Sequence, residues 1–255
     1  MFRLQQLPLS PFTRLNKLLE GLPPGRPPIN MHVGEPQHPV PGFVAPILAN
    51  HIDGFGKYPP INGPDGLREA IAAWLNRRFA LSPGIDPARQ VLPLVGTREG
   101  LFSAAFIAVP ETRRGQRPAV LLPNPFYQCY AAAALAAGAD PVYVNATAET
   151  GFLPAFDKLS PDLLARTAAV YMCSPSNPEG AAASPDYWRR LFALADEHGF
   201  TVLADECYSE IYTDAPPCGA LTIRQETAPG ADRLLVFHSL SKPVSYTHLT
   251  LPTKA

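Results

Sequence analysis

Polar residues that could do chemistry follow directly after three apolar runs of this sequence. They are Asn177 after the run at 168–173, Asp205 and Tyr208 after the run at 201–204, and Ser239 and Lys242 after the run at 234–238. An amide, a carboxylate, a phenol and an amine can together bind a small polar molecule and move protons on it. Each residue alone is a weak indication, because Asn-Pro is usually a turn and an aspartate that ends a strand is often a helix cap.

The elements that would position these groups follow from the spacing of the apolar residues. Helices are predicted over residues 64–79, 97–108, 126–137 and 185–198, and strands over 119–122, 142–144, 168–172, 201–204 and 234–238. Apolar strands that alternate with helices are typical of a mostly parallel sheet covered on both faces, so we predict an α/β fold. In such folds ligands bind outside the carboxyl ends of the strands, and the polar groups are expected to converge there.

The first 45 residues are rich in proline and in turn formers. Proline fixes the backbone and removes a hydrogen-bond donor, so we predict an extended arm here. Regular structure is expected to begin near Gly42.

The composition favours a small-molecule function. The 255 residues include 21 Lys and Arg against 22 Asp and Glu, which leaves no basic surface for nucleic acid or an anionic membrane. The sequence contains neither an apolar stretch long enough to span a membrane nor a secretion signal, so we expect a cytoplasmic protein. Four widely separated cysteines (Cys129, Cys173, Cys207 and Cys218) predict reduced, mostly buried side chains and no metal site.

The polar motifs, in this order and at this spacing, resemble those of the fold-type I pyridoxal phosphate enzymes, and among them the class I/II aminotransferases. The motifs are Gly96-Thr97-Arg98, Ser176-Asn177-Pro178-Glu179-Gly180, Asp205-Glu206-Cys207-Tyr208 and Ser239-Leu240-Ser241-Lys242. The runs at 34–39, 58–68 and 122–127 resemble the succinyldiaminopimelate aminotransferase branch of lysine biosynthesis. The resemblance implies pyridoxal 5′-phosphate as cofactor and transamination between an amino acid, expected to be glutamate, and a 2-oxo acid.

The resemblance assigns the catalytic groups residue by residue. Lys242 would hold the cofactor covalently and shuttle the proton at the substrate α-carbon. Asp205 would keep the pyridine nitrogen protonated, and Tyr208 with Asn177 would bind the phenolic oxygen. Glu206 is the competitor of Asp205, but adjacent residues of a strand point to opposite faces, and the family motif selects Asp205.

The remaining assignments concern binding. Gly96, Thr97 and Arg98 open a helix whose backbone N–H groups would hold the phosphate, with Ser239 adding a hydroxyl, and Arg98 is expected to act through its backbone. Tyr127 would stack on the cofactor ring, with Phe126 as its rival and Tyr130 in the core. In relatives the position of Tyr58 reaches the cofactor of the other subunit, which implies a homodimer, and the position of Gly34 approaches the substrate carboxylate.

The end of the chain departs from the family. Residues 243–255 resemble translated sequencing-adapter read-through, and the family's phosphate and carboxylate arginines do not follow Lys242. We therefore predict an arm with part of a small domain over 1–45, a truncated cofactor-binding large domain over 46–242 and a non-native tail over 243–255. Such a fragment is expected to bind cofactor poorly and to transaminate little or not at all.

Two other functions fit the same motifs. An aspartate, alanine or aromatic aminotransferase, or a lyase, would keep the fold and the cofactor but change the substrate. An inactive remnant that still binds cofactor would keep the fold but not the reaction. The joint presence of Asn177, Asp205, Tyr208 and Lys242 argues against the remnant, because each would be free to change once the chemistry was lost.

Overall fold

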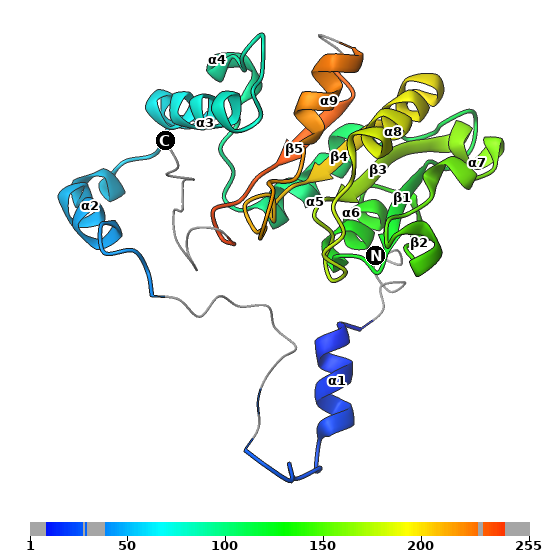
Figure 1. Cartoon of the computed structure of the whole chain (residues 1–255), viewed down its shortest axis with the longest axis horizontal. Coiled ribbons are helices and arrows are strands. Elements are labelled where there is room, and N and C mark those ends of the chain that lie inside the picture. Colours follow the sequence, from blue (N-terminus) through cyan, green and yellow to red (C-terminus); the bar gives the residue numbers. More distant parts are fainter. Residues whose placement is uncertain (1–8, 28, 30–38, 229–231, 243–255) are drawn as a thin grey trace.

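A parallel sheet organises the part of the chain that the computed structural model describes, residues 9–27, 29, 39–228 and 232–242. Its strands lie in the order β2 (Asp140–Asn145), β1 (Ala119–Asn124), β3 (Thr167–Cys173), β4 (Thr201–Asp205) and β5 (Leu234–Phe237) (Figure 1). Every adjacent pair is parallel, so all carboxyl ends meet at one edge. The predicted α/β fold is confirmed, and each predicted strand is present within two residues at either end.

Helices cover both faces of the sheet, and further helices lie outside these layers. They are α1 (Pro11–Leu19), α2 (Val44–Asn50), α3 (Asp65–Arg78), α4 (Pro87–Gln90), α5 (Thr97–Ala108), α6 (Gln128–Ala136), α7 (Pro161–Arg166), α8 (Pro185–His198) and α9 (Ala220–Thr227), with 3-10 turns η2 (Ile52–Gly56), η3 (Ala148–Thr150) and η4 (Phe156–Lys158). The core between α5, α6 and the sheet is separate from the core between α8, α9 and the opposite face. None of the helices in the described ranges is long and apolar enough to cross a membrane.

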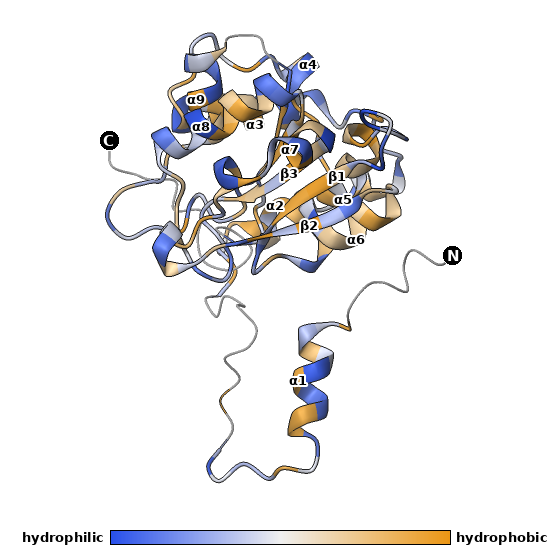
Figure 2. Ribbon diagram, turned by 90° about the vertical axis from the view of Figure 1, so that its right-hand side faces the viewer, coloured by the Kyte–Doolittle hydropathy of each residue, from blue (hydrophilic) through white to orange (hydrophobic). Residues whose placement is uncertain are grey.

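The two cores follow from the alternation of side chains along each strand. Leu122, Tyr171 and Leu203 face α5 and α6, whereas their neighbours Val170 and Val202 face α8. All five side chains are fully buried, so these strands read as continuous apolar runs in the sequence. Figure 2 shows the apolar residues gathered along the strands and on the helix sides that face them.

Local capping explains why α8 has the predicted bounds. Ser184 precedes the helix, and its hydroxyl accepts a hydrogen bond from the Tyr187 backbone N–H. Pro185 occupies the first turn, where a missing N–H does no harm. Gly199 ends the helix with φ +73°, a conformation that glycine adopts without strain. The predicted helix over 97–108 also coincides with α5.

The prediction for the arm was wrong, because α1 occupies Pro11–Leu19 and regular structure starts well before Gly42. Pro11 lies in the first turn of α1, where proline favours a helix start, so the proline-rich composition hid the element. No residue of α1 is buried, and the helix lies away from the sheet in both overall views (Figures 1 and 2). The small helices α2, α4, α7 and α9 were also not predicted.

Candidate active site

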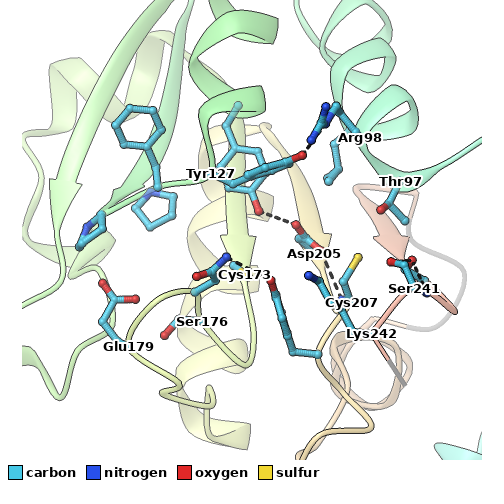
Figure 3. A pocket seen from close by; sticks show the side chains of 18 of the residues that line it. Thr97, Arg98, Tyr127, Cys173, Ser176, Glu179, Asp205, Cys207, Ser241 and Lys242 are labelled. Carbon is cyan, nitrogen blue, oxygen red and sulfur yellow. Dashed lines mark hydrogen bonds between the residues drawn. The ribbon is translucent and has the colours of Figure 1, made fainter. Parts of the chain in front are cut away.

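A cavity of about 710 Å³ opens at the carboxyl edge of the sheet. It is bounded by the N-terminus of α5 and by the segments that follow β1, β3, β4 and β5. Nine of the residues singled out in the sequence line it: Gly96, Thr97, Arg98, Tyr127, Asn177, Asp205, Tyr208, Ser239 and Lys242. Figure 3 shows the side chains of Thr97, Asp205 and Lys242 directed into this space.

Asp205 is a buried carboxylate fixed through both oxygens. It ends β4 and lies in register with Cys173 on β3 and Phe237 on β5, and it is 5% exposed. The Tyr130 hydroxyl donates to Oδ2 at 2.5 Å, and the Cys207 backbone N–H donates to Oδ1 at 3.3 Å. The carboxylate therefore faces the cavity in a set orientation.

Glu206 points to the opposite side of the sheet. Its Oε1 accepts a hydrogen bond from the backbone N–H of Ala220 at the start of α9, at 2.6 Å, and the residue does not line the cavity. Strand alternation thus separates the two adjacent carboxylates as the sequence argument requires. Asp205 is the carboxylate of this pair that a ligand in the cavity can reach.

Tyr130 contacts the site residue Asp205, which the sequence did not predict. It is 1% exposed and stacks on Tyr171 with ring centroids 4.4 Å apart, which fits the expected place in the core. Its hydroxyl, however, reaches Asp205, and burial raises the pKa of this phenol well above its ordinary value, so it stays a donor. Residue spacing gives no signal for this contact, because it depends on how closely α6 packs against β4.

The first turn of α5 provides hydrogen-bond donors at the edge of the cavity. Gly96 precedes the helix with φ +124°, a region closed to most side chains, and a Cβ there would lie 2.6 Å from Oε2 of Glu99. The first backbone N–H groups of any helix lack acceptors within the helix, and the helix dipole favours negative charge beside them. Thr97 adds its side chain to this edge of the cavity.

The side chains of Tyr127 and Arg98 are hydrogen-bonded to each other. Nε of Arg98 donates to the Tyr127 hydroxyl at 2.6 Å, and this bond raises the pKa of the guanidinium further. The guanidinium is therefore engaged by a side chain rather than directed at the helix N-terminus. Phe126, the rival of Tyr127, also lines the cavity and packs on Tyr143 with centroids 4.9 Å apart.

Asn177, Tyr208 and Lys242 come together from three segments. Nδ2 of Asn177 donates to the Tyr208 hydroxyl at 3.1 Å, and Nζ of Lys242 lies 5.7 Å from the centre of the Tyr208 ring. Burial raises the pKa of Tyr208 to about 12, so its hydroxyl remains protonated near neutral pH. Beside them the hydroxyls of Ser239 and Ser241 are 2.5 Å apart.

Of the two remaining predicted residues, one lies away from this cavity and the other falls outside the described residues. The side chain of Tyr58 is fully exposed and lies outside the cavity lining, and Gly34 lies outside the described residues. In turn the cavity has walls that sequence reasoning missed, among them Glu179, Cys173 and Cys207. Glu179 stands directly after Asn177-Pro178, so its closeness to the site could have been read from the motif.

The cysteines are free thiols, as predicted, and three of the four are buried. Burial raises the pKa of Cys129 to about 11, which makes it a poor nucleophile at neutral pH. Within the described ranges no three His, Cys, Asp or Glu side chains gather as a metal site requires.

Comparison with known proteins places this site in a family. The family described as aminotransferase class I and II matches residues 26–249. The chain belongs to the class I and II aminotransferases. This family depends on pyridoxal 5′-phosphate, and the resemblance seen in the motifs is confirmed.

Curated relatives carry related names. A protein of Dehalococcoides mccartyi named LL-diaminopimelate aminotransferase is 32% identical over 254 residues, which cover 96% of this chain and 61% of the relative. One of the same name from Aquifex aeolicus is 32% identical over 253 residues, with 96% and 62% covered. The chain thus spans a little over three fifths of the length of these aminotransferases.

Solved aminotransferases share the fold. An aminotransferase of Neisseria meningitidis Z2491 superposes with a TM-score of 0.87 at 38% identity, over 94% of this chain and 61% of that one. The N-succinyldiaminopimelate aminotransferase of Mycobacterium tuberculosis gives a TM-score of 0.75 at 26% identity, over 96% and 61%. The predicted fold-type I architecture is therefore confirmed.

The donor set of this aminotransferase cavity fits pyridoxal phosphate. A phosphate needs N–H and O–H donors at a helix N-terminus, a pyridine nitrogen needs a buried carboxylate, and a phenolic oxygen needs polar partners. The cavity presents these groups as the start of α5, Asp205 and the Asn177–Tyr208 pair. An amine, Lys242, lines the same space.

Proposed function

We propose that this chain provides the cofactor site of an aminotransferase that transfers an amino group from an amino acid to a 2-oxo acid. The observation that carries the proposal is the convergence of Asp205, Tyr208 and Lys242 in one cavity at the carboxyl edge of the sheet. These residues lie on different segments, and only the fold brings them together. Family membership supports the same reaction class.

The phosphate end of the site is formed by α5. The backbone N–H groups of Thr97 and Arg98, the Thr97 hydroxyl and the Ser239 hydroxyl would hold the phosphate. Gly96 would let the chain turn into the helix there, and Arg98 would contribute through its backbone because Tyr127 engages its side chain. The Tyr127 ring would stack on the pyridine.

The reactive end is formed by the strand ends. When bound, the cofactor supplies an electron sink for the charge left when a proton leaves the substrate α-carbon. Asp205 would hold the pyridine nitrogen, with Tyr130 fixing its orientation. Tyr208 and Asn177 would donate to the phenolic oxygen, and the amine of Lys242 would accept the α-proton and return it.

The substrate proposal rests on the relatives. Relatives at 30–32% identity are named LL-diaminopimelate aminotransferase, and a structural neighbour is named N-succinyldiaminopimelate aminotransferase. We propose that the amino acceptor is the succinylated amino-keto-pimelate intermediate of lysine biosynthesis, that glutamate is the amino donor, and that the enzyme works in the cytoplasm. The names do not favour the aspartate, alanine, lyase or remnant alternatives.

We also propose a homodimer as the working form. Tyr58 is fully exposed, and large apolar side chains of α1 and α2 (Phe12, Leu18, Leu19, Ile47 and Leu48) are about half exposed or more. An apolar surface of this kind marks a protein interface. A second copy would cover it and bring Tyr58 toward the neighbouring cofactor site.

Cofactor titration tests the proposal. The purified chain and its Lys242→Ala and Lys158→Ala variants are titrated with pyridoxal phosphate, and binding is followed by the visible absorbance of the covalently held cofactor. The wild type and Lys158→Ala are expected to give this band and Lys242→Ala to lose it. Release of 2-oxoglutarate from glutamate then tests transfer. For a chain that spans about three fifths of the length of its relatives we expect a weak band and little or no transfer, and a wild type whose band is no stronger than that of Lys242→Ala would contradict the proposal.

A further inference from the structure

Glu206, which is buried, and His238, whose side chain is 18% exposed, lie beside each other directly behind the cofactor cavity. Strands β4 and β5 pair Asp205 with Phe237, so Glu206 and His238 are the next residues along each strand end. The Glu206 backbone N–H donates to the Phe237 carbonyl at 2.9 Å, which continues the ladder. Oε2 of Glu206 lies 3.6 Å from Nε2 of His238, and Glu206 is 2% exposed.

Most polar side-chain atoms of this pair lack a hydrogen-bond partner among the described residues. Oε1 of Glu206 is occupied by the Ala220 backbone N–H, but Oε2 and both ring nitrogens of His238 are buried without a hydrogen-bond partner in the described part of the chain. The His238 ring is enclosed by Trp74 at 5.1 Å and Phe79 at 5.4 Å between centroids. At 3.6 Å, Oε2 and Nε2 lie just beyond hydrogen-bond distance, and because burying unpaired polar atoms is costly, a small approach that pairs them would be favourable.

Burial outweighs the groups that favour an ionised Glu206, because the Ala220 backbone N–H and the charge of Arg78 lower the pKa of this carboxyl less than burial raises it. Arg78 on α3 is bound by Glu210, with Nε 2.7 Å from Oε1, while Nη2 donates to two backbone carbonyls and the guanidinium lies over the rings of Phe79 and Tyr212. Asp205 lies on the other side of β4, and Cys218 is a neutral thiol whose pKa is raised. Burial raises the pKa of Glu206 to about 8 and lowers that of His238 to about 4.

We propose that Glu206 and His238 are positioning residues that share one proton in a buried hydrogen bond and thereby lock the ends of β4 and β5 together. The carboxyl group donates to the neutral imidazole. Each partner is covalently next to a residue of the cavity, since Asp205 precedes Glu206 and Ser239 follows His238. The pair thus sets the distance between Asp205 and the 239–242 turn that carries Lys242. The effect of this distance on the cofactor site rests on the proposed function, whereas the hydrogen bond between Glu206 and His238 does not.

The shared proton is tested on the chain without cofactor. Glu206→Gln keeps the acceptor for Ala220 and a donor toward His238 but cannot ionise, and Glu226→Gln makes the same change at a half-exposed position. A carboxyl whose pKa is raised in the folded state stabilises the fold at pH values below its ordinary pKa. This contribution is lost as the pH rises through the folded pKa. Between about pH 6 and about pH 9, the urea midpoint of the wild type and of Glu226→Gln is expected to fall more than that of Glu206→Gln. Equal pH profiles for all three proteins would overturn the proposal.

The positioning effect is tested by cofactor affinity. His238→Phe retains a ring between Trp74 and Phe79 but leaves the carboxyl of Glu206 without its acceptor, and its Kd for pyridoxal phosphate is expected to rise about tenfold near pH 7. Glu206→Gln is expected to bind nearly as the wild type near pH 7 and to lose less affinity near pH 9. Wild-type affinity in His238→Phe would overturn the positioning claim. A wild type that binds no cofactor would contradict the proposed function and, with it, the claim that the pair positions the site. The urea midpoints would still show whether Glu206 and His238 share a proton.

Discussion

The hydrogen bond between Tyr130 and Asp205 offers a sharp test of how the site is held. In Tyr130→Phe the ring still stacks on Tyr171, and only the hydroxyl that donates to Oδ2 of Asp205 is removed. The residue is 1% exposed and Asp205 is 5% exposed, so water does not readily replace the lost donor. The change therefore isolates one buried, charge-assisted hydrogen bond.

The magnitude follows from the partners. A hydrogen bond to a charged group contributes about 1.5–3 kcal/mol, so we expect the free energy of unfolding to fall by about 2 kcal/mol. For a chain of this size that corresponds to a melting temperature lower by about 4–8 °C. The affinity for pyridoxal phosphate is expected to fall about tenfold, because the carboxylate that would meet the pyridine nitrogen is less firmly oriented.

Two matched variants make the result interpretable. Tyr127→Phe removes a hydroxyl bonded to Arg98 near the surface and is expected to change the free energy of unfolding by about 0.5 kcal/mol or less. Tyr171→Phe removes a buried hydroxyl that donates to the Leu101 carbonyl at 2.6 Å, with an expected loss of about 1 kcal/mol. Urea unfolding measures all three variants. If Tyr130→Phe is no less stable than Tyr127→Phe, the bond to Asp205 does not hold the site and the reasoning is refuted.

Two further predictions concern the frame around the site. Gly96→Ala, at φ +124°, is expected to lower the free energy of unfolding by about 1–3 kcal/mol in urea denaturation, and Gly25→Ala, whose added Cβ would meet nothing, should not. Arg224 binds both oxygens of Asp196 at 2.7 Å and lowers the pKa of that carboxyl, so the stability it adds is present above the ordinary aspartate range and lost as the pH falls. Because Asp196 is 46% exposed, Asp196→Asn is expected to lower the free energy of unfolding by about 1 kcal/mol near pH 7 and by less near pH 3. Calorimetry at both pH values measures this, and an equal loss at the two would count against a contribution of this ion pair.

The sequence predicted those elements whose signals are local. Residues 184–199 combine a serine cap, a proline in the first turn and a final glycine, so the sequence marks both ends of α8. The strands are apolar throughout because both faces of the sheet are covered. By contrast α1 was missed although Phe12, Leu15, Leu18 and Leu19 recur at helical spacing, because the prolines around it indicate an extended arm and none of its residues is buried.

The site was predictable where a motif marks it and not where only packing does. Asn177, Asp205, Tyr208 and Lys242 follow strands, and the rule for parallel sheets brings them to one edge. The bond of Tyr130 to Asp205 depends on rotamers and on the packing of α6 against β4, and the bond of Arg98 to Tyr127 on the packing of α5 beside the start of α6, which spacing alone does not give. The pairing of Glu206 with His238 needs the β4–β5 register, which the sequence does not state.

The most direct test of the account locates the cofactor on the chain. The protein is incubated with pyridoxal phosphate and reduced with borohydride, which makes the linkage to an amine permanent, and the modified peptide is identified by mass spectrometry. The account predicts the label on Lys242 and not on Lys17, Lys57, Lys158 or Lys254. A label distributed over the other lysines, or one that persists unchanged in Lys242→Ala, would contradict the claim that this cavity is the cofactor site.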